Sequence, residues 1–112
     1  MAKAINFNNV KKRYLTITLA DEKNTVLMIG TPTKAVMNDL VLLRSGFESL
    51  GEDANEEVLD DLYNVCARVM SRNKTGKKIT KEYLEEIFDF EDIILFFHAY
   101  IEFVSELANA KN

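Results

Sequence analysis

The sequence predicts one α+β domain, in which an N-terminal antiparallel β-hairpin packs against about four α-helices. Alternation with the period of a strand appears between residues 11 and 30, whereas apolar residues recur at three- and four-residue steps from 33 to 109. A chain of 112 residues, 47% hydrophobic and 29% charged, has the size and composition of a single globular domain. We therefore assign 1–112 to one domain and expect residues 1–10 to be a flexible arm or a short extra strand.

The predicted hairpin occupies residues 11–30. Leu15, Ile17 and Leu19 alternate with threonines and a tyrosine, which is the pattern of a half-buried strand. The turn-forming sequence ADEKN separates this strand from a second one over 25–29, whose residues are apolar on both parities. We therefore expect the second strand to be covered on both faces. Because two strands alone are marginally stable in water, the sheet needs helices on one face or a neighbouring chain that continues it.

Two long helices are predicted next. The first has Thr31 or Thr33 as its N-cap and ends near Gly51, and we expect its apolar side to pack on the sheet. The second starts near Asp53 or Asn55 and runs to the basic loop RNKTGKK.

Two further helices complete the predicted fold. Thr80 caps a short helix with the sequence KEYLEEIF. Asp89 and Asp92, three residues apart, resemble a capping box that opens a final helix running to about Ala108.

The final helix is more apolar than one buried face requires. In EDIILFFHAYIEF, residues 91–103, hydrophobic side chains surround most of the helix. Either the hairpin and the other helices sandwich it, or part of it is an interface with another chain. The residues that we expect to contact a partner or another subunit in the second case are Phe96, Tyr100, Ile101, Phe103 and Val104.

The second predicted helix separates charges of opposite sign. Seven acids and no base lie between residues 48 and 61, and six bases and no acid lie between 68 and 81. Either both ends are solvated and favoured by the helix dipole, or the acidic end of one subunit meets the basic loop of the next in a ring or spiral. The residues predicted for such electrostatic self-association are Glu52, Asp53, Glu56, Glu57, Arg72, Lys74, Lys77 and Lys78.

The sequence contains no pattern typical of an enzyme or a metal site. It has no glycine-rich phosphate loop and no nucleophile elbow, Cys66 lies in an apolar helical row as a buried thiol would, and His98 has no second ligand at metal-binding spacing. The net charge of −4 disfavours nucleic acid as a partner, and no apolar run approaches the roughly 20 residues that span a bilayer. We therefore expect a non-enzymatic cytoplasmic protein that uses no cofactor and binds neither nucleic acid nor membranes.

Two stretches carry a resemblance to a known family. TVLMIGTPTKAVMNDL joins the predicted sheet to the first helix, and FEDIILFFHAYIEFV lies in the last helix. Together with the order of hairpin and helices, they resemble the tail assembly chaperones of long-tailed bacteriophages that infect Gram-positive hosts. The resemblance implies a protein of the host cytoplasm that self-associates and has two further partners, the helical tape measure protein and the tail tube protein. Such a protein coats the tape measure protein until tail tube subunits polymerise around it. The resemblance also implies that the protein is absent from the mature virion.

Two other functions fit the same residues. One is a structural connector or tail-completion ring protein, which would use the hairpin and the charges for permanent rings and would remain in purified virions. The other is a small host-directed regulator, which would be monomeric and would bind one protein partner with one-to-one stoichiometry.

The gene offers a test of the family resemblance. Many phage families of this kind make a longer form by ribosomal frameshifting, and Ala110-Lys111-Asn112 can be encoded by GCA AAA AAC, which contains the slippery heptamer A AAA AAC. Other codons specify the same residues without a slip. Sequencing this region distinguishes the cases: the heptamer followed by an open −1 frame supports the chaperone, whereas a plain stop with neither feature supports the connector ring.

Overall fold

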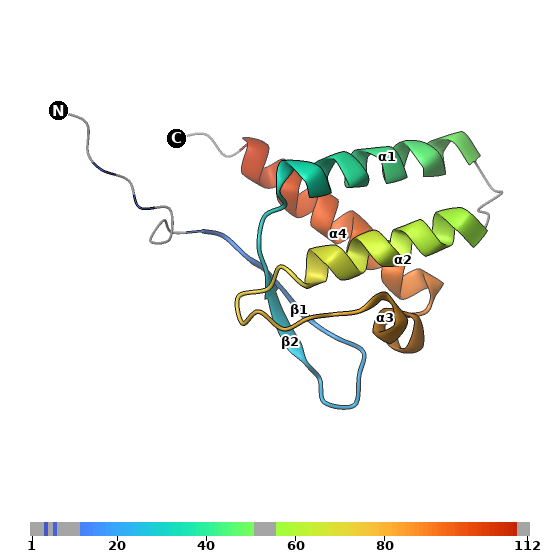
Figure 1. The fold of residues 1–112 in the computed structure, drawn as a ribbon, viewed down its shortest axis with the longest axis horizontal. Helices are drawn as coiled ribbons and strands as arrows, with labels where there is room; N and C mark the ends of the chain where they lie inside the picture. The colour runs from blue at the N-terminus through green and yellow to red at the C-terminus, as the bar shows by residue number, and fades with distance from the viewer. Residues whose placement is uncertain (1–3, 5, 7–11, 51–55, 110–112) are drawn as a thin grey trace.

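The computed structural model describes residues 4, 6, 12–50 and 56–109 (Figure 1). The predicted fold class is confirmed, because an antiparallel two-stranded hairpin precedes four helices. The predicted helix boundaries at Gly51, Asp53 and Asn55, and most of the predicted N-terminal arm, lie outside the described residues. The elements are β1 (Leu15–Thr18), β2 (Val26–Ile29), α1 (Lys34–Leu50), α2 (Glu56–Met70), α3 (Lys81–Ile87) and α4 (Phe90–Asn109).

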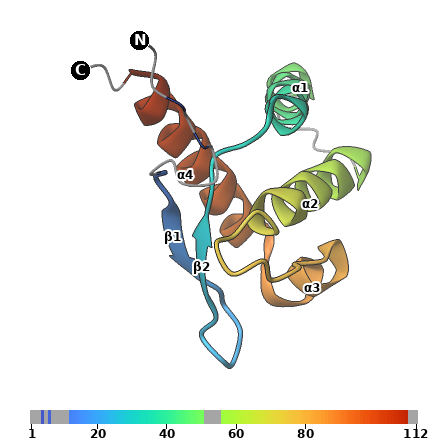
Figure 2. The ribbon, with the colours of Figure 1, turned by 60° about the vertical axis from the view of Figure 1, so that its left-hand side comes forward.

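Helix α2 is the central element of the fold. It packs against α1, α3 and α4, and it also contacts β2 (Figures 1 and 2). We predicted that α1 packs on the sheet, and this is wrong. The main packing partner of α1 is α2, and the two helices lie side by side. Two strands about 4.8 Å apart form a sheet roughly as wide as one helix, so its inner face has little room beyond α2 and α4.

The hairpin has one covered face and one open face. Leu27 and Ile29 of β2 are buried, and they are joined on the inner face by Leu19, which follows β1. On the outer face Val26 and Met28 remain 58% and 37% exposed. The prediction that the second strand is covered on both faces is therefore wrong, because the helices that cover the sheet lie on one side of it (Figure 2).

The outer edge of β2 is paired with the loop that follows α2. The Gly30 amide donates to the carbonyl oxygen of Arg72 at 2.8 Å, and the Lys74 amide donates to the carbonyl oxygen of Met28 at 2.9 Å. A bridge between Ile29 and Asn73 lies between these bonds. Residues 72–74 therefore act as a short third strand on this edge.

Buried Asn73 organises the basic loop. Its side-chain amide donates to the carbonyl oxygens of Met70 and Lys77, at 2.9 and 2.6 Å. Its side-chain oxygen accepts from the Thr75 hydroxyl and the Lys77 amide, both at 2.9 Å. Gly76 has a φ of 75°, which a residue with a Cβ rarely adopts. The loop is thus a compact turn built around one asparagine.

The predicted helix caps are largely confirmed. Of the two candidates for α1, Thr33 precedes the helix, and its hydroxyl accepts from the Val36 amide at 3.4 Å. Thr80 caps α3 by accepting from the Tyr83 amide at 3.1 Å. Asp89 and Asp92 form the reciprocal capping box of α4: the Asp89 amide donates to the Asp92 carboxylate at 3.1 Å, and the Asp92 amide donates to the Asp89 carboxylate at 2.9 Å.

Asp21 ties the tip of the hairpin to α3. Its carboxylate accepts from the Thr25 amide at 2.9 Å, the Thr25 hydroxyl at 2.7 Å and the Tyr83 hydroxyl at 2.6 Å. These bonds, with that of Tyr83 as the largest cause and those of Thr25 next, lower the pKa of Asp21 from 3.8 to about 2. The charged form of this carboxylate therefore stabilises the folded state.

We predict that the effect of Asp21→Asn on stability depends on pH. Because the folded-state pKa lies below the ordinary value, the stabilisation by the carboxylate is present above about pH 4 and is lost as the pH falls through about 2. The substitution should therefore lower the melting temperature at pH 6 more than at pH 2, as followed by circular dichroism. Glu22→Gln, at the exposed neighbouring acid, is the control. An equal loss at both pH values would contradict the assignment.

Candidate protein-interaction site

Phe96 and Tyr100 belong to the core. Their side chains are 5% and 1% exposed, and their ring centroids lie 6.0 Å apart. The Tyr100 hydroxyl donates to the carbonyl oxygen of Gly30 at 2.8 Å, which attaches α4 to the end of β2. Both residues were predicted as partner contacts, but their burial makes them unavailable to a partner while this fold is intact.

The other three predicted contact residues are accessible. Ile101, Phe103 and Val104 are half-buried and pack at the margin of the core. From residue 101 to residue 107, no side chain of α4 is fully buried. The fully buried side chains among residues 90–107 of α4 therefore lie in its first half, although Phe90 and Leu95 there are exposed, and the second half leaves apolar surface partly exposed.

An apolar groove of about 410 Å³ lies between β1 and one side of α4. Leu95, at its margin, is 70% exposed. Full burial of a large apolar side chain is more favourable than full exposure to water by a free energy of roughly 1.5–3 kcal/mol. The residues that line the groove are Ile17, Thr18, Ala20, Phe88, Asp92, Leu95, Phe96 and Ala99.

A second apolar surface lies between α1 and the other side of α4. At about 100° per residue, Ile94 and Ile101 of α4 point away from the side that carries Leu95. On α1, Leu42 lines a groove shared with α2, so that Met37 and Val41 lie toward the opposite side of their helix. We use the name α1–α4 surface for the five residues that this spacing places on it: Met37, Val41, Ile94, Ile101 and Val104.

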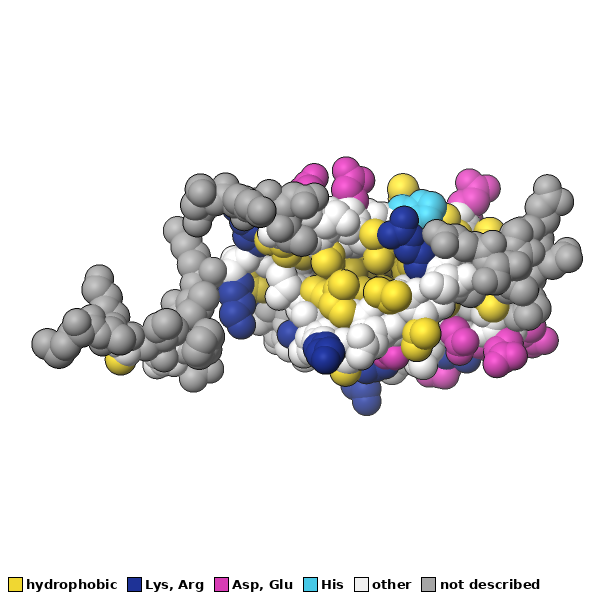
Figure 3. Space-filling view, turned by 90° about the horizontal axis from the view of Figure 1, so that it is seen from above, with side chains coloured by type: hydrophobic (Ala, Val, Ile, Leu, Met, Phe, Trp, Pro, Cys, Tyr) yellow, Lys and Arg dark blue, Asp and Glu magenta, His cyan; other side chains and the backbone are white. Residues whose placement is uncertain are grey.

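The α1–α4 surface is visible from above the molecule. In Figure 3 hydrophobic side chains gather in a hollow at the middle of this face, with the histidine at its margin and charged side chains around it. Val41 is 57% exposed, and the other four members are half-buried. An apolar floor between two helices, bordered by polar groups, is the shape that receives a third amphipathic helix.

The exposed side chains of α1 were missed by the sequence analysis. Val41 and Leu42 are 57% and 71% exposed. They lie outside the apolar stripe that recurs at three- and four-residue steps in this helix, which consists of Val36, Met37, Leu40, Leu43, Phe47 and Leu50. Their position off that stripe is the signal that could have identified them, since apolar residues outside the core stripe of an amphipathic helix face solvent or a partner.

Two of the predicted bases serve the fold itself. The Nε of Arg72 donates to the carbonyl oxygen of Thr31 at 3.1 Å, and the Nζ of Lys74 lies 5.8 Å from the centroid of the Tyr14 ring. Lys77 and Lys78 are exposed.

On the acidic side, Glu56 and Glu57 are exposed in the first turn of α2, whereas Glu52 and Asp53 lie outside the described residues. Electrostatic self-association stays a prediction, and among the described residues its exposed members are Glu56, Glu57, Lys77 and Lys78.

The single cysteine and the single histidine of the chain lie on different helices, α2 and α4. Cys66 is buried as predicted, and burial raises the pKa of its thiol well above the ordinary value. His98 is exposed on α4. No cluster of three or more His, Cys, Asp or Glu side chains that could hold a metal ion occurs among the described residues. Within the same residues, no helix combines the length and hydropathy needed to cross a membrane.

Comparisons with known proteins identify no relative: no family model matches the chain, and no curated protein or solved structure is significantly similar to it. The surfaces described above are therefore the features of this chain that point to a function.

We predict that Tyr100→Phe lowers the free energy of unfolding by about 1–3 kcal/mol, because it removes a hydrogen bond and leaves the Gly30 carbonyl without this donor. Urea denaturation measures the difference, with Tyr14→Phe, at a half-buried tyrosine before β1, as the control. A loss no larger than that of the control would contradict the structural role given to the Tyr100 hydroxyl.

Proposed function

We propose that this chain is a non-enzymatic phage tail assembly chaperone. It self-associates and binds the tape measure protein, keeping it soluble until tail tube subunits polymerise around it. It acts in the host cytoplasm without a cofactor, binds neither nucleic acid nor membranes, and is absent from the mature virion.

The α1–α4 surface is the observation that carries this proposal. A tape measure protein is long and largely helical, so its amphipathic turns present apolar side chains at three- and four-residue steps. Such a helix fits between α1 and α4 and covers Val41, Ile101 and Val104, which the described part of the chain leaves partly in water. Captured in this way, the apolar side of the client is shielded from other clients.

The energetics suit temporary binding. Four of the five side chains of the α1–α4 surface are already half-buried, so a client adds only the remaining part of the roughly 1.5–3 kcal/mol that full burial of each provides. One subunit therefore binds a client helix weakly. Several associated subunits on one long client bind it strongly through multivalency, and the growing tail tube can still displace them one at a time.

The alternative function is a structural connector or tail-completion ring protein that remains in the virion. Permanent subunit interfaces are large and apolar, commonly above about 2,000 Å² of buried surface. Here the large exposed apolar side chains are divided among β2, α1 and α4, which favours exchangeable contacts. Mass spectrometry of purified virions separates the two functions, with absence of the chain expected for the chaperone.

We predict that Val41→Glu impairs client holding and that Leu42→Glu does not. Both side chains are exposed on α1, but Val41 belongs to the α1–α4 surface, whereas Leu42 lines the α1–α2 groove. A buried glutamate opposes docking of an apolar helix. In co-expression with the tape measure protein of the same phage, Val41→Glu should reduce the soluble client about tenfold or more, which corresponds to roughly 1.4 kcal/mol.

The pair of variants is its own control, because each adds one carboxylate to the same helix at an exposed position. Melting temperatures within a few degrees of each other would establish that both variants are folded. Equal loss of soluble client in both, or full retention in both, would contradict binding through the α1–α4 surface.

A further inference from the structure

The backbone of β1 has an open edge. Leu19 pairs with Thr25 and donates its amide to the Thr25 carbonyl oxygen at 2.8 Å. In an antiparallel ladder hydrogen-bonded pairs alternate, so Ile17 and Leu15 also direct their backbone groups toward β2. The amides and carbonyls of Thr16 and Thr18 therefore point away from the hairpin.

The two edges of the sheet differ in what covers them. The β2 edge is paired with residues 72–74, as described above. Along the β1 edge, the described residues place no strand, since the sheet has two strands and its isolated bridge is on the other side (Figure 2). An uncovered edge with free backbone donors and acceptors is a template for strand addition.

The surroundings of the open edge are apolar. The groove between β1 and α4 lies along it, with half-buried Ile17 on its floor and exposed Leu95 on its wall. A strand added to β1 would place its inward side chains against these two residues. Both apolar burial and backbone hydrogen bonds therefore favour an occupant with an alternating apolar pattern.

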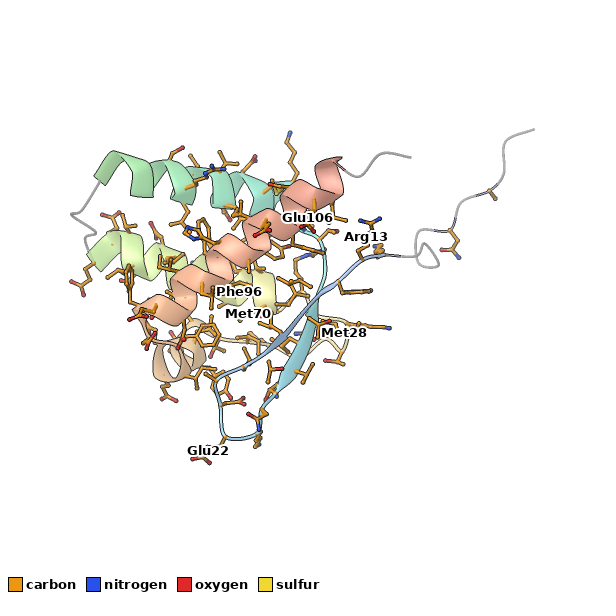
Figure 4. The ribbon with its side chains drawn as sticks, turned by 180° about the vertical axis from the view of Figure 1, so that it is seen from behind. Arg13, Glu22, Met28, Met70, Phe96 and Glu106 are labelled. Atoms are coloured by element: carbon orange, nitrogen blue, oxygen red, sulfur yellow. The ribbon has the colours of Figure 1, made fainter. Side chains whose placement is uncertain are left out.

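β1 itself has that pattern, and its charges are self-complementary. Bases precede it and acids follow it, and Figure 4 shows Arg13 and Glu22 at its opposite ends. With two copies antiparallel and Ile17 opposite Ile17, Thr16 lies opposite Thr18 in two hydrogen-bonded pairs, as the open backbone groups require. This register also brings Lys12 and Arg13 of one copy toward Asp21 and Glu22 of the other, which lie in the turn that follows β1.

Other registers with the same backbone parity lack this match. A shift of two residues in one direction places Arg13 opposite Lys23, which is repulsive. The same shift in the other direction places Lys12 opposite Ala20 and removes the match between Lys12 and Glu22. Charge complementarity therefore favours the register in which both basic residues meet an acid.

We propose that two copies of this chain associate through their β1 edges, forming a continuous four-stranded antiparallel sheet in the order β2-β1-β1-β2 about a two-fold axis at Ile17. Directly opposed residues share a face, so Leu15 of each copy joins Leu19 of the other on the inner side. Leu95 of each copy is then covered by the other copy's strand. The contact specifies how the self-association in the proposed function would occur, and it depends on neither a phage client nor the α1–α4 surface.

A charge exchange tests the register. Lys12 and Glu22 are both exposed, whereas Asp21 is already bonded to Thr25 and Tyr83. Lys12→Glu replaces the attraction between positions 12 and 22 with repulsion between two acids, and Glu22→Lys replaces it with repulsion between two bases. The two-fold symmetry repeats this contact, so each variant has two repulsive contacts per dimer. Sedimentation equilibrium of the full chain at low salt should show a wild-type dimer. Each single variant should have a dissociation constant raised about tenfold, and the double variant should return to within about threefold of wild type.

Proline substitutions test the edge. Thr16→Pro removes an amide that the hairpin does not use, so it should block dimerisation and preserve the fold. Val26→Pro removes an outward amide from the other strand and should dimerise like wild type. Circular dichroism reports folding, and the charge exchange decides the matter if a proline variant is unfolded.

A wild-type monomer at all concentrations, a double charge variant as weak as the single ones, or a folded Thr16→Pro variant that dimerises normally would each overturn the proposed contact. These substitutions lie outside the α1–α4 surface, so the dimer and client binding can fail separately.

Discussion

The fold depends on Gly30, where three segments far apart in the sequence meet. Its amide donates to Arg72 after α2, and its carbonyl oxygen accepts from Tyr100 of α4, both at 2.8 Å. A Cβ at this position would lie 3.4 Å from the Arg72 carbonyl oxygen, which is an ordinary van der Waals contact, so the two hydrogen bonds define the junction and not the lack of a side chain. Because a two-stranded sheet is marginal alone, these bonds and the side chains beneath them give the hairpin its stability.

The same junction determines where apolar surface remains. α4 is anchored to the hairpin at Tyr100, and among its residues up to Leu107 the fully buried side chains all precede or coincide with Tyr100. Farther along, the helix still carries an apolar stripe, but the described chain supplies too few elements to enclose it. The exposed surface near α1 is thus a geometric result of packing four helices around a narrow sheet.

Local features were predictable from the sequence, and the choice of packing partner was not. The caps at Thr80 and Asp89 were correct because a cap is decided by residues three positions apart. The predictions for the outer face of β2 and for the packing of α1 were wrong. Periodicity identifies the apolar side of an element but does not identify the element that covers it. For the same reason the sequence could place Tyr100 and Ile101 on one apolar helix but could not separate a core residue from a partly exposed one.

An open strand edge and an apolar helical surface on different parts of the chain allow assembly and client binding to occur together. An isologous β1 contact closes at two subunits, so it cannot by itself produce a ring or spiral. A larger assembly needs a second, heterologous contact. Opposite charges at separate places on the chain are suited to it: the acids Glu56 and Glu57 at the start of α2, and the bases Lys77 and Lys78 in the loop after α2. Because exposed ion pairs are screened by salt, such an assembly would lose its electrostatic contacts first and separate into dimers held by backbone hydrogen bonds. If the proposed dimer and the proposed client binding both hold, the dimer would be the unit that is exchanged along a client, and the charged contact would set how many units gather on it.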